Sequence, residues 1–294
     1  MKRILLATDG CPESAGAVLV AERMARAGAE VRAVTVMPLL STYAAGFPRA
    51  LPDLEALLED RAAERLLEYA AAQARGLGAE NVLASLSIET GEPPSAIVRA
   101  AADWNASLII VGLGSHSPVD RLFGTETALR VAHLGSVPIL AVPANVVDLP
   151  RRGIAAVDFS TFSTDALQAA AGLLDKDGEL ALVHVVPRPT FHEGTGAFPI
   201  FASEARAALT ELARTLEAQH GIRTSVHVRE GDIARQVLAL AGETAADLLA
   251  AGSHGHGFLG RLLLGSTSTR LIRGAQCSML VTPPHEAVPP STSS

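Results

Sequence analysis

The chain has 294 residues, of which 48% are hydrophobic, 19% charged and 4% aromatic, and its formal net charge is -7. The hydrophobic share excludes a disordered chain, and the acidic balance argues against nucleic acid as a partner, because such a partner needs a basic surface. Two cysteines are too few for a disulfide framework and suit a reducing compartment.

The first predicted element is a short buried strand at residues 4–9, which follows Lys2 and Arg3. Thr8 and Asp9 end its apolar run far short of the apolar stretch of a signal peptide. Nowhere do about 18 apolar residues run together, so no membrane-spanning helix is expected. We therefore expect a cytoplasmic protein that has no contact with a membrane.

The rest of the first half contains a long helix and further apolar strands. The helix at about 53–76 has a row of leucines for packing in the core or at an interface, and a charged face for solvent. Apolar strands are predicted at 107–112 and 137–143. The proline-bearing segment that follows, at 144–153, is a predicted linker.

The second half repeats the first. Residues 107–112 and 137–143 return 140 positions later, and residues 4–9 return 149 positions later at 154–158. Such a repeat defines the whole architecture, so the chain is interpreted as a tandem duplication. The predicted parts are domain 1 at 1–143, a linker at 144–153, domain 2 at 154–283 and a disordered tail at 284–294.

Short apolar strands alternate with helices throughout the second half. The predicted strands are 154–158, 180–186, 222–228, 247–252 and 277–282, and the predicted helices are about 163–175, 203–220, 232–243 and 265–274. Strands that are apolar on both faces are typical of parallel strands between two helical layers. The predicted fold class is therefore α/β, with two tandem doubly wound, Rossmann-like domains of about five parallel strands each.

Two loops of the second half carry the residues that suggest a binding site, because ligands of doubly wound sheets bind beyond the carboxyl ends of the strands. The first loop contains Asp158, and the second contains Gly252, Gly255 and Gly265 before Ser266 opens a helix. Glycines let backbone N–H groups approach a ligand, and a helix N-terminus attracts anions. The sequence thus predicts a phosphate cradle, although it has neither a dinucleotide fingerprint nor a P-loop.

These motifs resemble the ATP-binding branch of the universal stress protein family. That branch has Gly, two residues, Gly, nine residues and then Gly-Ser/Thr, and Gly252, Gly255, Gly265 and Ser266 have this spacing. The resemblance covers both halves and includes the end of a strand at 184–186. It implies a Rossmann-like fold of the HUP type in each half, with ATP, accompanied by Mg2+, as the ligand of the second half.

The resemblance also implies a role for individual residues. Asp158 would contact the ribose, and Val157 and Val185 would line the adenine pocket. The residues implied near the phosphates are Gly252, His254, Gly255, Gly265, Ser266, Thr267 and Ser268. Purely structural roles stay open beside these: a carboxylate that accepts backbone hydrogen bonds at a helix N-terminus, and glycines that only permit tight turns.

The first half departs from the motif. Gly112 aligns with the first motif glycine, but Thr125 and Glu126 stand where the third glycine and its serine are expected. A carboxylate that faces a triphosphate repels it. A shifted register that uses Gly124 stays open, and Asp9 still matches the ribose position. We therefore expect a degenerate site in domain 1, whose role is packing and the display of a partner surface.

Neither a metal centre nor a catalytic centre is predicted. His254 and His256 form a His-x-His pair, but no Cys or carboxylate joins them at ligand spacing. Arg261 is interpreted as a solvated residue, with contact to a terminal phosphate as the alternative. The sequence shows no convincing general base, no acidic pair for magnesium and no positioned lysine.

The sequence therefore favours a regulatory or stress-response module that binds an adenine nucleotide. Two alternatives stay open: a slow ATPase or a phosphoryl or nucleotidyl transferase at the same cleft, and an interaction scaffold without nucleotide. Because members of the family generally pair through their last strands, residues 137–142 and 277–282 are expected to join the halves as an internal pseudo-dimer. A homodimer and a protein partner of unspecified kind would also fit the resemblance.

Overall fold

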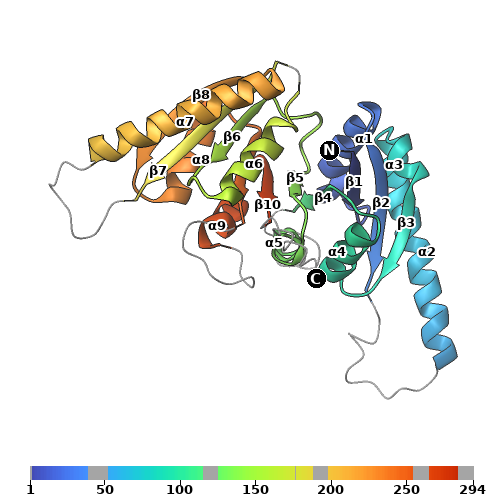
Figure 1. Cartoon of the computed structure of the whole chain (residues 1–294). Coiled ribbons are helices and arrows are strands. Elements are labelled where there is room, and N and C mark those ends of the chain that lie inside the picture. The colour runs from blue at the N-terminus through green and yellow to red at the C-terminus, as the bar shows by residue number, and fades with distance from the viewer. Residues whose placement is uncertain are drawn as a thin grey trace, which may run out of the picture.

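The fold is a single ten-stranded sheet that both halves of the chain build together. Figure 1 shows the two halves on either side of the central strands, with helices on both faces. The computed structural model describes residues 2–38, 52–114, 125–175, 177–187, 198–253 and 265–283. The expected tail at 284–294 lies outside these residues.

Domain 1 alternates strands and helices and contributes five strands to the sheet. Its strands are β1 (Arg3–Ala7), β2 (Glu30–Met37), β3 (Leu86–Thr90), β4 (Leu108–Leu113) and β5 (Ile139–Pro143). Its helices are η1 (Pro12–Ser14), α1 (Ala15–Arg26), α2 (Pro52–Gly76), α3 (Glu80–Ala84), α4 (Pro93–Asp103) and α5 (Thr125–Leu134).

Domain 2 repeats this order of strands. Its strands are β6 (Arg152–Ala156), β7 (Glu179–Val186), β8 (Arg223–Glu230), β9 (Leu248–Gly252) and β10 (Ser278–Thr282). Its helices are α6 (Thr161–Ala171), α7 (Phe198–His220), α8 (Ile233–Thr244) and α9 (Ser266–Gly274). β6 begins at Arg152, two residues inside the segment predicted as a linker.

The strand order is β3-β2-β1-β4-β5 in domain 1 and, in the mirrored direction, β10-β9-β6-β7-β8 in domain 2. Within each half the neighbouring strands run parallel. In both halves the order reverses beside the first strand, between β1 and β4 and between β6 and β9. The prediction of two doubly wound α/β domains is confirmed, and these reversal points are where such sheets bind ligands.

The core consists of two apolar layers, one on each face of the sheet, and each layer runs through both halves. Ile4 and Leu6 belong to the layer covered by α1, α2, α3, α6 and α7, whereas Leu5 belongs to the layer covered by α4, α5, α8 and α9. All three side chains are fully buried. Burial of each such side chain contributes about 1.5–3 kcal/mol, which explains why strands apolar on both faces lie at the centre.

The two halves meet at one antiparallel strand pair, β5 with β10. Met279, Leu280 and Val281 lie opposite Ala141, Leu140 and Ile139. The pairing expected between residues 137–142 and 277–282 is therefore present in the structure. At this seam the backbone groups of both strands find partners, and Leu140 and Leu280 are buried.

Candidate functional site

The glycine motif of domain 2 begins at the end of β9 and finishes at the start of α9, and hydrogen bonds hold these two points together. The Ser268 hydroxyl donates to the Gly252 carbonyl over 2.7 Å. The Gly265 N–H donates to the Ser253 carbonyl over 2.8 Å, and the Ser253 N–H donates to the Thr282 carbonyl. The two ends of the motif therefore lie side by side at the carboxyl end of the sheet.

The start of α9 differs from the starts of α6 and α8. The side chains of Ser160 and Asp232 cap α6 and α8 by accepting backbone N–H groups. The residue at this position of α9 is Gly265, which has no side chain that could cap the first turn. The first N–H groups of a helix have no partner inside the helix, so α9 presents donors and a positive dipole end to a ligand.

Gly252 is required by the packing of α6. A Cβ atom at Gly252 would lie 2.7 Å from the Cβ atom and 2.9 Å from the carbonyl carbon of Phe162, which is too close for any side chain. In domain 1, a Cβ atom at Gly112 would lie 3.0 Å from the Glu13 carbonyl oxygen. The structural reason for these glycines, close contact between strand and helix, thus applies in both halves.

Asp158 forms a tight turn with Ser160. Its Oδ1 atom accepts hydrogen bonds from the Ser160 N–H over 3.0 Å and from the Ser160 hydroxyl over 2.5 Å. In domain 1, Oδ1 of Asp9 accepts the N–H of Cys11 in the same way, over 3.0 Å. In both halves this carboxylate therefore accepts a backbone hydrogen bond just before a helix, which is the structural alternative to ribose binding. The contact with ribose stays a prediction.

The two valines predicted to line one pocket belong to different layers. Val157 packs in the layer of α6 and α7, while Val185 packs in the layer of α8 and α9. The His184 ring also holds Val157, because its Nδ1 atom lies 2.7 Å from the Val157 carbonyl oxygen. Only Val185 thus presents its side chain to the face of the sheet on which α9 begins.

An aromatic contact that sequence reasoning missed lies beside these residues. The rings of Phe159 and His184 are 4.9 Å apart between centroids. Phe159 adopts a φ of 64°, in the left-handed region. Its counterpart in domain 1 is Gly10, which also has a positive φ, of 75°. The bulky residue after Asp158 in place of a glycine was the signal that could have indicated this contact.

Two residues of the predicted phosphate site, His254 and Gly255, lie outside the described residues, as do His256 and Arg261. Of the three residues that open α9, Ser266 is exposed, Thr267 is half-buried and Ser268 is buried. Within the described ranges, no group of three His, Cys, Asp or Glu side chains could hold a metal ion.

An ion pair fixes α9 against α8. Both guanidinium NH groups of Arg270 donate to the Asp232 carboxylate, over 2.7 and 2.8 Å. These hydrogen bonds, together with the backbone N–H of Arg235, lower the pKa of Asp232 to about 2. Domain 1 repeats the arrangement with Arg130 and Glu92, the residue that caps α4. The pair thus belongs to the common scaffold of both halves.

Arg270→Leu is expected to return the pKa of Asp232 from about 2 toward its ordinary value of 3.8, because the guanidinium is the main cause of the shift. A depressed pKa stabilises the fold above the unfolded-state pKa, and that contribution disappears as the pH falls through about 2. NMR titration of the carboxyl carbon of Asp232 measures this change. The matched control is Arg130→Leu, and an equal shift of Asp232 in that variant would contradict the assignment.

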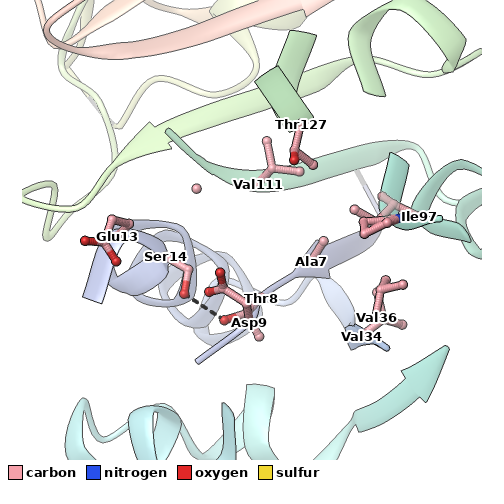
Figure 2. Close-up of a pocket in the computed structure, with 12 residues that line it drawn as sticks. Ala7, Thr8, Asp9, Glu13, Ser14, Val34, Val36, Ile97, Val111 and Thr127 are labelled. Atoms are coloured by element: carbon pink, nitrogen blue, oxygen red, sulfur yellow. Dashed lines mark hydrogen bonds between the residues drawn. The ribbon is translucent and has the colours of Figure 1, made fainter. Parts of the chain in front are cut away.

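Domain 1 contains a pocket at the position where the sequence predicts a degenerate site (Figure 2). It lies at the carboxyl ends of the neighbouring strands β1 and β4, where the strand order reverses, and it encloses about 480 Å³ including its opening to solvent. Its lining residues are Ala7, Thr8, Asp9, Glu13, Ser14, Val34, Val36, Pro93, Ile97, Val111, Gly112 and Thr127. Sequence reasoning identified Asp9 and Gly112 here but not the polar residues beside them.

Glu126, the residue expected to repel phosphate in domain 1, lies between the two domains. Its carboxylate is exposed and lies 3.8 Å from a guanidinium nitrogen of Arg273 on α9. The residue of α5 that lines the pocket is its neighbour Thr127. α5 and α9 thus face each other across the seam, on the same face of the sheet.

The fold and this site define a class of protein: a tandem pair of doubly wound α/β domains with candidate ligand sites at the carboxyl ends of their strands. The model of the universal stress protein family matches residues 1–143 and again residues 151–283. The chain belongs to the universal stress protein family, with two copies of the family's domain. Across the described ranges, no helix combines the length and the apolar character needed to cross a membrane.

Individual relatives agree with this assignment. Universal stress protein A homolog 1 of Coxiella burnetii is 32% identical over 136 residues, which are 43% of this chain and 92% of that protein. Universal stress protein Sll1654 of Synechocystis is 31% identical over 128 residues, again 43% of this chain and 82% of that protein. Each of these relatives thus matches less than half of this chain.

A solved structure resembles the whole chain. The crystal structure of a universal stress protein from Archaeoglobus fulgidus has a TM-score of 0.68 and is 24% identical, and the match covers 96% of both chains. At this identity the likeness concerns the fold. It extends through both domains of the present chain.

Proposed function

We propose that domain 2 binds ATP, accompanied by Mg2+, and that the chain acts as a regulatory or stress-response module. The observation that carries this proposal is the joining of β9 to the uncapped start of α9, because backbone N–H groups at a glycine-led helix start are suited to phosphate. The resemblance of Gly252, Gly255, Gly265 and Ser266 to the ATP-binding motif supports it.

Within this proposal each residue has a role. The Asp158 carboxylate receives ribose hydroxyl groups and the Val185 side chain packs against adenine, whereas Val157 contributes through its backbone, since its side chain faces the other layer. The residues proposed to surround the phosphates are Gly252, His254, Gly255, Gly265, Ser266, Thr267 and Ser268. Because Oδ1 of Asp158 already accepts two hydrogen bonds, this carboxylate is better suited to binding than to proton transfer.

The proposal treats the chain as an internal pseudo-dimer of domains 1–143 and 154–283, present in the cytoplasm. The β5–β10 pair supports this division, because it is where the two repeats meet. The family's domain matches on both sides of the segment 144–150. Association of two whole chains as a homodimer is a separate prediction, for analytical ultracentrifugation.

Calorimetric titration of nucleotide-stripped protein with ATP and Mg2+ tests the proposed function through stoichiometry. We expect one ATP per chain, because the residue before α9 is Gly265, whereas the corresponding position of domain 1 is Thr125. Two equivalent sites would show that domain 1 binds ATP as well. No heat of binding at millimolar ATP would contradict the proposal.

A further inference from the structure

The pairing of β5 with β10 is symmetric about one point. Leu140 lies opposite Leu280, and these two residues are equivalent in the repeat, because they are 140 positions apart. The residues on either side of them pair in the same symmetric register. Since the two strands are antiparallel, a local two-fold axis passes between the leucines. Each contact beside the seam is therefore expected to have a mirrored contact between the equivalent residues.

The helices α5 and α9 follow this symmetry. They lie in the same helical layer and contact each other at the seam (Figure 1). They end at equivalent positions, Leu134 and Gly274. Glu126 in the first turn of α5 lies 3.8 Å from Arg273 in the last turn of α9, measured between a carboxylate oxygen and a guanidinium nitrogen. The start of α5 thus lies beside the end of α9.

The mirrored contact brings domain 1 to the start of α9. The residue equivalent to Glu126 is Ser266, and the residue equivalent to Arg273 is His133. Ser266 is the first residue of α9, and His133 is the basic residue in the last turn of α5. Both side chains are exposed. The symmetry of the seam therefore places His133 beside the first turn of α9.

The two mirrored positions differ in charge. At the start of α5, the Glu126 carboxylate occupies the Arg273 guanidinium. At the start of α9, the residue that faces domain 1 is Ser266, which brings no charge, and Gly265 before it has no side chain that could accept from the first N–H groups. An imidazole ring and the start of a helix both donate hydrogen bonds, and a phosphate group can accept from both.

We infer that His133 of domain 1 is a binding residue of the phosphate site proposed for domain 2, where its ring N–H donates to a phosphate oxygen across the seam. This inference rests on the proposed function, since it concerns the same phosphate groups. The site is then built by both domains. Domain 2 supplies the backbone N–H groups of α9, and domain 1 supplies the histidine.

Calorimetric titration of the full chain with ATP and with adenosine tests this role. His133→Ala is expected to weaken ATP binding about fivefold and adenosine binding less than about twofold, because adenosine has no phosphate to accept the hydrogen bond. His133→Arg, which copies the equivalent residue Arg273, is expected to bind ATP at least as tightly as the original chain, since a guanidinium also donates to phosphate.

The matched control is His220→Ala. His220 is an exposed histidine in the last turn of α7, a helix that packs on β7 and β8. We expect its loss to change ATP affinity less than about twofold, because it lies far from the seam.

Cross-linking tests the proximity without any nucleotide. In a chain whose two native cysteines are changed to serine, His133→Cys combined with Ser266→Cys is expected to give an intramolecular link with a short bis-maleimide, detected by mass spectrometry. The control pair is Glu126→Cys with Arg273→Cys, whose original side chains lie together across the seam.

The outcomes separate the inference from the proposed function. A link between positions 133 and 266, with a loss of ATP affinity in His133→Ala that His133→Arg restores, supports the inference. No link where the control pair links, equal losses for ATP and adenosine, or unchanged ATP affinity in His133→Ala would overturn it, while ATP binding by the original chain keeps the proposed function. No ATP binding by the original chain would overturn both.

Discussion

Gly265→Glu is expected to reduce the affinity of domain 2 for ATP by about a hundredfold. The substitution places a carboxylate at the start of α9, where it repels phosphate and occupies the N–H groups that are proposed to bind it. Gly265 has φ -57° and ψ 145°, values that any residue can adopt, so the backbone need not change. Calorimetric titration with ATP and Mg2+ measures the effect.

The matched control is Thr125→Glu, which adds the same charge at the corresponding place in domain 1. We expect ATP affinity to stay within about twofold of the original chain in this variant, because exposed charges at distance are screened by salt. An equal loss in both variants would assign the effect to net charge. Wild-type affinity in Gly265→Glu would show that the phosphates do not lie at α9.

Glu22→Ala is expected to destabilise domain 1 by about 3 kcal/mol. The Glu22 side chain is 4% exposed and accepts hydrogen bonds from the Arg26 guanidinium, the Asn81 amide and the backbone N–H groups of Asn81 and Val82. Without the carboxylate the N–H of the buried residue Val82 loses its partner, and the exposed Asn81 and Arg26 lose the group that ties α3 to α1. Denaturant unfolding monitored by circular dichroism measures the change.

The control for this prediction is Glu80→Ala, an exposed residue of α3, the helix that carries Asn81 and Val82, with an expected loss below about 1 kcal/mol. Burial alone would raise the pKa of Glu22, but the hydrogen bonds from Asn81, Arg26 and Val82 outweigh it and hold the pKa below 4.5. The stabilisation by Glu22 is thus complete above the unfolded-state pKa and disappears as the pH falls through the folded one. Equal stability of the Glu22→Ala and Glu80→Ala variants would contradict this account.

The sequence was sufficient to predict the fold because its strands are apolar on both faces and recur at fixed spacing. The helix boundaries were harder to predict. α6 ends at Ala171, before the predicted residue 175, and is followed by Gly172. α7 begins at Phe198, five residues before the predicted start. Periodicity alone does not show where backbone donors and acceptors find other partners, so helix ends are its weakest point.

The candidate site could be predicted only in part. Asp158, Gly252 and Ser266 were found because spacing along the chain identifies them, and the structure brings their segments to one edge of the sheet. The separation of Val157 from Val185 follows from which face of the sheet each residue occupies, and spacing does not report this. Likewise, the pocket of domain 1 combines residues from Ala7 to Thr127, which only the folded sheet brings together.

The seam between β5 and β10 has a further consequence. Each of these strands has its other neighbour within its own domain, so neither edge is left for a second copy of the chain, and the outer strands of the described sheet are β3 and β8. Because one polypeptide carries both domains, dilution does not change their one-to-one ratio. The proposed site of domain 2 and the pocket of domain 1 can therefore differ in sequence while the β5–β10 pair is kept.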